Sequence, residues 1–136
     1  MKKYTEPYLI EFSKIGNSVV GYISVAEAQR HVPFEIRRVF WTYFTPEELT
    51  RGHHAHYYTQ QVLIAVAGKI NVHTEMPDGS KLVYTLEKPN VGIFLPPHCW
   101  HYMEYSHSAV QLVLASSVYD ENDYIRDYNI YKQVYV

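Results

Sequence analysis

Three histidines stand close together in the sequence, at positions 53, 54 and 56. In an extended strand, alternate side chains point to the same face, so His54 and His56 are expected to project together and His53 to point away. An imidazole changes its protonation near neutral pH, and it is also a common metal ligand. The pair therefore predicts one of two chemistries, proton transfer or metal binding.

The residues that follow the pair bear on this choice. Gln61 lies five positions after His56, and a proline-rich stretch further on ends in His101. This spacing resembles the two cupin motifs, in which His54, His56, Gln61 and His101 would be the metal ligands. A neutral glutamine in place of the usual glutamate brings no charge to a divalent cation. Proton transfer is therefore the leading interpretation, and a metal-dependent cupin enzyme such as a dioxygenase stays open as an alternative.

The elements that must position these residues are short apolar or alternating segments separated by turn residues, the pattern of a sandwich or barrel. The expected strands are Tyr8–Phe12, Val19–Val25, Ile36–Tyr43, Gln60–Ala67, Lys69–Thr74, Lys81–Leu86, Gly92–Leu95, Trp100–Tyr105 and Ala109–Ser116. A tight hairpin is predicted at Met76–Ser80. Helical signals are confined to Val25–His31 and to Tyr119–Tyr128, which Asp120 could cap. The sequence predicts a single all-β domain over residues 1–136, with minor short helices.

Composition excludes several classes of function. The net charge is −2, and no run of lysines or arginines marks a surface for nucleic acid. No stretch approaches the roughly 20 apolar residues of a membrane span, and the first residues lack the apolar core of a signal peptide. Cys99 is the only cysteine, so no internal disulfide can form. We expect a cytoplasmic protein whose partners are neither nucleic acid nor membrane.

Several longer blocks are more selective than the cupin spacing alone. They are Pro33–Val39, Arg51–His56, Trp100–His101, Leu114–Ser116 and Tyr119–Arg126, in this order. On these blocks the chain resembles the sugar nucleotide 3,4-ketoisomerases, also described as WxcM-like cupins, from Phe12 to the C-terminus. The resemblance implies an RmlC-like jelly-roll cupin barrel, a homodimer that shares N-terminal strands, and no metal or other cofactor.

The resemblance also implies a substrate and a reaction. Members of the family move the carbonyl group of a dTDP-linked 4-keto-6-deoxyhexose from C4 to C3. The products lead to the 3-amino-3,6-dideoxy sugars of bacterial surface polysaccharides, such as O-antigen lipopolysaccharide, and of S-layer glycans. Such an isomerisation removes a proton next to a ketone and passes through an enediol, which imidazoles can catalyse near neutral pH. We expect His54 and His56 to be the catalytic residues, with the assignment of base and acid open.

Substrate-binding residues follow from side-chain chemistry and from the same resemblance. A guanidinium fork suits phosphate oxygens, so Arg38 and Arg51 are predicted to bind the pyrophosphate. Trp100 and His101 are expected to line the inner pocket. Tyr43 is expected to supply a hydroxyl from a different depth of the barrel.

The chain departs from the family at one place that bears on catalysis. After the Arg38-Val39 pair, family members commonly carry tyrosines, whose hydroxyls can bind or protonate the sugar. Phe40 and Trp41 stand there instead. A cupin that binds a nucleotide sugar without turnover is therefore a further alternative. Near the C-terminus, Asp123 and Arg126 are spaced for an ion pair on one helical turn, and a structural role is favoured over a catalytic one.

Overall fold

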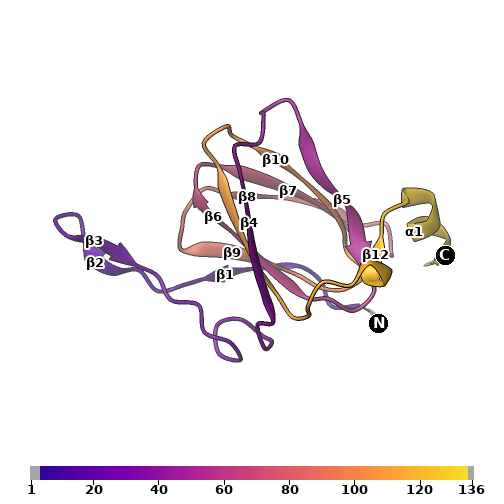
Figure 1. The fold of residues 1–136 in the computed structure, drawn as a ribbon, viewed down its shortest axis with the longest axis horizontal. Helices are drawn as coiled ribbons and strands as arrows, with labels where there is room; N and C mark the ends of the chain where they lie inside the picture. Colours follow the sequence, from indigo (N-terminus) through magenta and orange to yellow (C-terminus); the bar gives the residue numbers. More distant parts are fainter. Residues whose placement is uncertain (1–3, 135–136) are drawn as a thin grey trace.

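Two five-stranded antiparallel sheets face each other in the computed structural model, which describes residues 4–134 (Figure 1). Sheet 1 contains, in spatial order, β1 (Tyr8–Glu11), β9 (Val91–Leu95), β6 (Gln61–Ala67), β11 (Val110–Ala115) and β4 (Arg38–Tyr43). Sheet 2 contains β12 (Tyr124–Ile125), β5 (Thr50–His56), β10 (Trp100–Tyr105), β7 (Ile70–Glu75) and β8 (Lys81–Leu86). The predicted predominance of strands is confirmed. One of these strands is β5, and it carries His54 and His56, whose expected common direction requires a strand.

The main core lies between the two sheets. Leu63 and Val113 from sheet 1 meet Val72 and Met103 from sheet 2, and all four are buried. Throughout, the inner face of a sheet means the face that carries these residues. Burial of the apolar side chains that alternate along each strand stabilises the sandwich, at about 25 cal/mol per Å² of apolar surface.

The outer face of sheet 1 is also covered. Val32 and Phe34, from the segment that precedes β4, pack with Val62, Phe94 and Leu114 on that face. β6 therefore has apolar neighbours on both sides. This explains why its sequence reads as a nearly continuous apolar run rather than as a strict alternation.

The two predicted helices met different outcomes. Val25–His31 forms turns and no helix, so that prediction is wrong; the backbone N–H of Glu27 donates to Nδ1 of His31, and Gln29 has a positive φ of 63°. The prediction over Tyr119–Tyr128 is partly right. A 3₁₀ turn, η1 (Glu121–Asp123), begins there, and Asp120 caps it by accepting from the N–H of Asn122.

The chain after this turn returns to sheet 2 before it ends. β12 pairs with β5, and the α-helix α1 (Tyr128–Val134) then packs over the outer face of sheet 2. None of the helices in the described part of the chain is long and apolar enough to cross a membrane.

A second hairpin stands apart from the barrel. β2 (Ile15–Asn17) and β3 (Gly21–Ile23) pair only with each other and project away from the two sheets (Figure 1). We call residues 15–23 the arm. The predicted strand over Val19–Val25 is partly wrong, because Val19 and Val20 form the turn, where their N–H groups donate to the side chain of Asn17.

Candidate active site

Three histidines meet on the inner face of sheet 2. The ring centroids of His54 and His56, two residues apart on β5, are 5.0 Å apart. His101 lies opposite His54 on β10, with ring centroids 4.7 Å apart. Ala55, between the pair, points to the outer face and packs under α1. His54 and His56 therefore point in the same direction, as strand alternation predicts.

A β-bulge in β5 brings an arginine to the same face. Tyr102 pairs with Gly52 and His101 pairs with His54, so His53 is the extra residue of β5. Gly52 and His53 both have positive φ angles, 99° and 58°. Because of the extra residue, Arg51 lies opposite Met103 and shares the inner face, although strict alternation would have placed it with His53.

Gly52 is required by this arrangement. A Cβ atom at that position would lie 3.0 Å from the carbonyl oxygen of His101 and 3.1 Å from Cα of Tyr102. His53 itself is exposed and stacks on Tyr102 at the outer face, with ring centroids 4.9 Å apart. His53 therefore points away from the other two histidines, as strand alternation predicts.

Behind His56 lies a buried carboxylate, Asp123. Its Oδ2 accepts from Nδ1 of His56 at 2.8 Å and from the hydroxyl of Thr59, and its Oδ1 accepts from the backbone N–H of Tyr58. Burial opposes ionisation, but the hydrogen bonds from His56, Thr59 and Tyr58 outweigh it and hold the pKa of Asp123 at about 2.

The ionised carboxylate fixes the tautomer of its partner. Since Asp123 can only accept, Nδ1 of His56 carries the hydrogen, and Nε2 keeps its lone pair while the ring is neutral. Nε2 is buried and makes no hydrogen bond within residues 4–134. His56 is therefore arranged to take a proton at Nε2, and Asp123 would stabilise the resulting imidazolium.

The other two histidines are held neutral. Burial and the nearby rings of His101 and His56 lower the pKa of His54 to about 2. Burial lowers the pKa of His101 to about 4, although its Nδ1–H donates to the carbonyl oxygen of Cys99. Like-charge repulsion among three adjacent rings permits one imidazolium at most near neutral pH. Of the three rings, His56 is the one that donates to a carboxylate.

The two arginines predicted to bind phosphate differ in their surroundings. Arg38 is on the inner side of β4, beside Phe40 and Tyr119, with its guanidinium 5.4 Å and 5.8 Å from their ring centroids. Its Nε is buried, with no hydrogen-bond partner among the described residues. Arg51 is exposed, and its positive charge partly offsets the rise in the pKa of Tyr105 that burial causes. Arg38 therefore has the stronger structural case for an anion ligand.

Two predicted site residues are placed elsewhere. Trp100 is on the face of β10 opposite to His101, packed under α1 against Tyr128 and Tyr131, with ring centroids 5.2 Å and 5.5 Å away. The expectation that it lines the inner pocket is wrong, because adjacent residues of a strand point to opposite faces.

Tyr43 is likewise on the outer side of its strand. It pairs with Val110, and its ring contacts Phe44 in an exposed position. Arg38 and Phe40 have the opposite parity and point inward. The expectation that Tyr43 supplies a hydroxyl inside the barrel is therefore wrong.

The segment from Tyr119 to Arg126 holds residues that sequence reasoning missed. The predicted ion pair between Asp123 and Arg126 is wrong: Asp123 faces His56, and Arg126 makes a two-pronged ion pair with Glu121, at 2.6 Å and 3.0 Å. Tyr124 lies opposite His56 in the β12–β5 pair and faces inward with it. The signal was present as a conspicuous sequence block, but helical spacing suggested the wrong partners.

A comparison with known proteins identifies the family of this chain. Residues 5–135 match the FdtA family, described as WxcM-like, C-terminal. The chain belongs to this family. A curated relative from Aneurinibacillus thermoaerophilus is 38% identical over 130 residues, which are 94% of this chain and 91% of the relative. That relative is a TDP-4-oxo-6-deoxy-alpha-D-glucose-3,4-oxoisomerase.

Solved structures of related enzymes agree with this FdtA-family assignment. The sugar 3,4-ketoisomerase QdtA from Thermoanaerobacterium thermosaccharolyticum, in complex with TDP, is 35% identical, with a TM-score of 0.90 over 95% of this chain and 93% of that one. A histidine-to-asparagine mutant of QdtA was solved in complex with TDP-4-keto-6-deoxyglucose. The epimerase RmlC from Legionella pneumophila, 14% identical with a TM-score of 0.75 over 91% of this chain and 73% of that one, shows the fold alone. The predicted RmlC-like cupin barrel is confirmed.

The metal-dependent alternative would need its ligands among the three inward-facing histidines and Gln61. Within residues 4–134, no three His, Cys, Asp or Glu side chains form a group that could hold a metal ion. Gln61, which replaces the cupin glutamate, contributes no charge.

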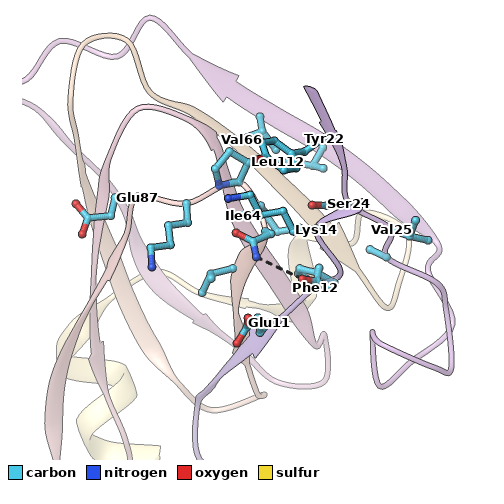
Figure 2. A pocket seen from close by; sticks show the side chains of 15 residues that line it. Glu11, Phe12, Lys14, Tyr22, Ser24, Val25, Ile64, Val66, Glu87 and Leu112 are labelled. Atoms are coloured by element: carbon cyan, nitrogen blue, oxygen red, sulfur yellow. Dashed lines mark hydrogen bonds between the residues drawn. The ribbon is translucent and has the colours of Figure 1, made fainter. Parts of the chain in front are cut away.

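A cavity of about 900 Å³ lies away from the histidines, between the arm and the outer face of sheet 1. Figure 2 shows Lys14, Tyr22 and Ser24 beside Ile64 and Leu112. None of the predicted catalytic or substrate-binding residues lines it.

Proposed function

We propose that this chain is a sugar nucleotide 3,4-ketoisomerase that converts a dTDP-4-keto-6-deoxyhexose into the dTDP-3-keto-6-deoxyhexose. The observation that carries the proposal is the buried pair of His56 and Asp123, which lies beside two neutral histidines on the inner face of the barrel. Family membership and the activity of the curated relative support the same reaction.

The proposed chemistry begins at C3 of the sugar. His56 takes the C3 proton at Nε2, the electron pair of the C3–H bond forms the C3–C4 double bond, and the electron pair of the C4=O π bond moves to the oxygen, which takes a proton. The resulting enediol collapses when the C3 oxygen releases its proton, C4 receives a proton from His56, and a C3 ketone remains. Asp123 stabilises His56 while it holds the proton, and acid–base catalysis of this kind contributes about 10²–10⁴-fold.

His54 has a different role in this proposal. A ring whose pKa is about 2 cannot act as an imidazolium near neutral pH. A neutral imidazole can still donate a hydrogen bond and polarise a carbonyl group, as in triosephosphate isomerase. We therefore assign His54 to the sugar oxygens and His56 to the carbon-bound protons.

Arg38 and Arg51 are assigned to the pyrophosphate. The buried Nε of Arg38 without a partner favours an anion beside it. Arg38→Ala and Arg51→Ala should each weaken dTDP binding, as measured by calorimetry. If the dTDP affinity of a variant is unchanged, that arginine does not bind the pyrophosphate.

Location of the protein in the cytoplasm stays a prediction.

An NMR time course tests the proposed activity. Chelator-treated protein is mixed with dTDP-4-keto-6-deoxyglucose in D2O, and migration of the carbonyl group from C4 to C3 is expected, with deuterium at C4 of the product. His54→Asn and His56→Asn should abolish turnover and leave dTDP affinity nearly unchanged. Recovery of activity only with an added metal would favour a metal-dependent cupin. Tight dTDP binding without conversion would favour a cupin that only binds.

We also infer that the protein acts as a homodimer, in which the arm contacts a second copy. Val19, Val20 and Ile23 on the arm are 89%, 78% and 65% exposed. A cluster of apolar side chains on a projecting hairpin is typical of an interaction surface. The cavity beside the arm (Figure 2) continues this surface onto the barrel.

Light scattering coupled to gel filtration tests the dimer. The native chain should elute with twice the mass of the monomer, and the double variant Val19→Lys, Val20→Lys should elute as a folded monomer. A monomeric native chain at micromolar concentration would contradict the inference.

A further inference from the structure

The loop between β5 and β6, residues 57–60, carries a buried hydroxyl to which the proposed chemistry gives no role. This hydroxyl belongs to Thr59, which is 2% exposed. It bonds to Oδ2 of Asp123, the oxygen that also accepts from Nδ1 of His56, and to the hydroxyl of Ser117. Thr59 therefore contacts the pair of His56 and Asp123 from the side of the carboxylate.

The direction of these hydrogen bonds follows from the number of hydrogens available. The ionised carboxylate of Asp123 can only accept, so the hydrogen of the Thr59 hydroxyl points to Oδ2. A hydroxyl has one hydrogen, and the bond between Thr59 and Ser117 must therefore use the hydrogen of Ser117. Ser117 and Thr59 thus form a chain of donors that ends at Oδ2, beside Nδ1 of His56.

Backbone hydrogen bonds hold the loop against the segment that carries Asp123. The N–H of Tyr57 donates to the carbonyl oxygen of Asp123, and the N–H of Gln60 donates to the hydroxyl of Ser116. The N–H of Ser116 in turn donates to the carbonyl oxygen of Gln60. The two segments are therefore in fixed register, and the side chains of Thr59 and Asp123 meet although 64 positions separate them.

A buried carboxylate depends on such donors for its charge and its orientation. Asp123 is 2% exposed, and burial opposes its ionisation. The hydrogen bonds from His56, Thr59 and the backbone of Tyr58 outweigh burial and hold the pKa of Asp123 at about 2. Without the Thr59 hydroxyl, Oδ2 would keep a single donor, so the carboxyl group would be freer to rotate and easier to protonate.

We propose that Thr59 is a positioning residue, whose hydroxyl, supported by Ser117, keeps the carboxylate of Asp123 charged and directed at Nδ1 of His56. The role requires no contact with the sugar nucleotide and no proton transfer by Thr59. The inference rests on the proposed ketoisomerase function, which the pair of His56 and Asp123 serves. The contrasting role is that of a loop residue that matters for folding alone.

Two substitutions separate the hydroxyl of Thr59 from the shape of its side chain. Thr59→Val keeps the shape and removes the hydroxyl, whereas Thr59→Ser keeps the hydroxyl and removes a methyl group. With dTDP-4-keto-6-deoxyglucose, Thr59→Val should lower the turnover number by about 10–100-fold, as expected for a lost hydrogen bond to a charged group. KM should change less than about threefold, and Thr59→Ser should stay within about threefold of native turnover.

Thr85→Val is the matched control. The hydroxyl of Thr85 also donates to a side-chain oxygen, Oδ1 of Asn71, but it lies on β8, at the edge of sheet 2 opposite to β12. This variant should keep native turnover. Ser117→Ala gives a second test, which does not depend on the folding of Thr59→Val, and its turnover number should fall by about 2–10-fold.

A proton NMR spectrum measures the pair without turnover. The hydrogen on Nδ1 of His56, bonded to a carboxylate, should give a far-downfield signal that is absent from His56→Asn. The signal should persist in Thr59→Ser and Thr85→Val and should shift or disappear in Thr59→Val.

Three results would overturn the positioning role. They are native turnover in both Thr59→Val and Ser117→Ala, equal losses of turnover in Thr59→Val and Thr59→Ser, and an unchanged downfield signal in Thr59→Val. An inactive native chain whose signal still responds to Thr59→Val would overturn the ketoisomerase function instead, and it would support the positioning of Asp123 by Thr59.

Discussion

At the scale of single residues, the chemistry depends on which histidine has an anionic partner. His56 donates to Asp123, whereas His54 is hydrogen-bonded to the backbone of Gly52 and lies beside other rings and the charge of Arg126. Two identical side chains, two positions apart, thus have different surroundings. The difference comes from desolvation and from one buried carboxylate.

Asp123→Asn should lower the turnover number by about 10²–10⁴-fold while dTDP affinity changes less than about threefold. The amide keeps the shape of the side chain but loses the charge that orients and stabilises His56. Steady-state kinetics with the 4-keto sugar nucleotide measures the effect. Asp127→Asn, a change of the same type in the loop before α1, is the control and should leave turnover unchanged. Native-like turnover of Asp123→Asn would remove the dyad from the mechanism.

At the scale of elements, the bulge in β5 decides which side chains share a face. It depends on Gly52, because the backbone there has φ of +99° and the space for a Cβ atom is filled by β10. Without the extra residue, Arg51 would point away from His54. The bulge is therefore part of the site, although it carries no reactive group.

Gly52→Ala should destabilise the fold by about 1–3 kcal/mol more than the control, because the added Cβ would press against β10. Gly79→Ala is the control, since Gly79 also has a positive φ, of +87°, but nothing lies within 4 Å of the added Cβ. That change should cost about 1 kcal/mol. Urea unfolding of both variants measures the difference. Equal losses would mean that contact with β10 adds nothing.

The outer face of sheet 2 gives a second prediction at this scale. Trp100 packs with Tyr131 under α1, and the hydroxyl of Tyr131 donates to the carbonyl oxygens of His98 and Glu75. Trp100→Phe should therefore reduce stability by about 1–3 kcal/mol. The affinity for dTDP should stay within about twofold, by calorimetry. A large loss of affinity would return Trp100 to the binding site.

At the scale of the whole molecule, buried neutral histidines make stability depend on pH. In the unfolded chain His101 is protonated below about pH 6.5, whereas in the folded chain this requires a pH near 4. Between these values the unfolded state binds more protons, so stability falls as the pH decreases. The effect of one such group is on the order of 1–3 kcal/mol.

Melting temperatures at pH 7 and pH 4.5 test this dependence. The native protein should lose stability over this interval, and His101→Gln should lose distinctly less, whatever its stability at pH 7. His107→Gln, in an exposed loop, is the control and should follow the native curve. If His101→Gln also follows that curve, burial of His101 does not contribute to the pH dependence.

Much of this molecule could be predicted from the chain alone. Alternation along strands placed most of the β-structure and predicted that His54 and His56 point together, because strand periodicity is local. The ordered blocks from Pro33 to Arg126 indicated the family. The same alternation should have excluded Trp100 and Tyr43 from the barrel interior, since their strands direct His101 and Arg38, of opposite parity, inward.

Only the tertiary structure decided how the site works. Asp123 reaches His56 from 67 residues away in sequence, and β12 brings Tyr124 beside both histidines. The bulge at Gly52 places Arg51 on the face of β5 opposite to the one that strand alternation predicts. Sequence spacing determines directions within one element. The protonation of a histidine depends on which distant carboxylate, ring or solvent the folded chain places against it.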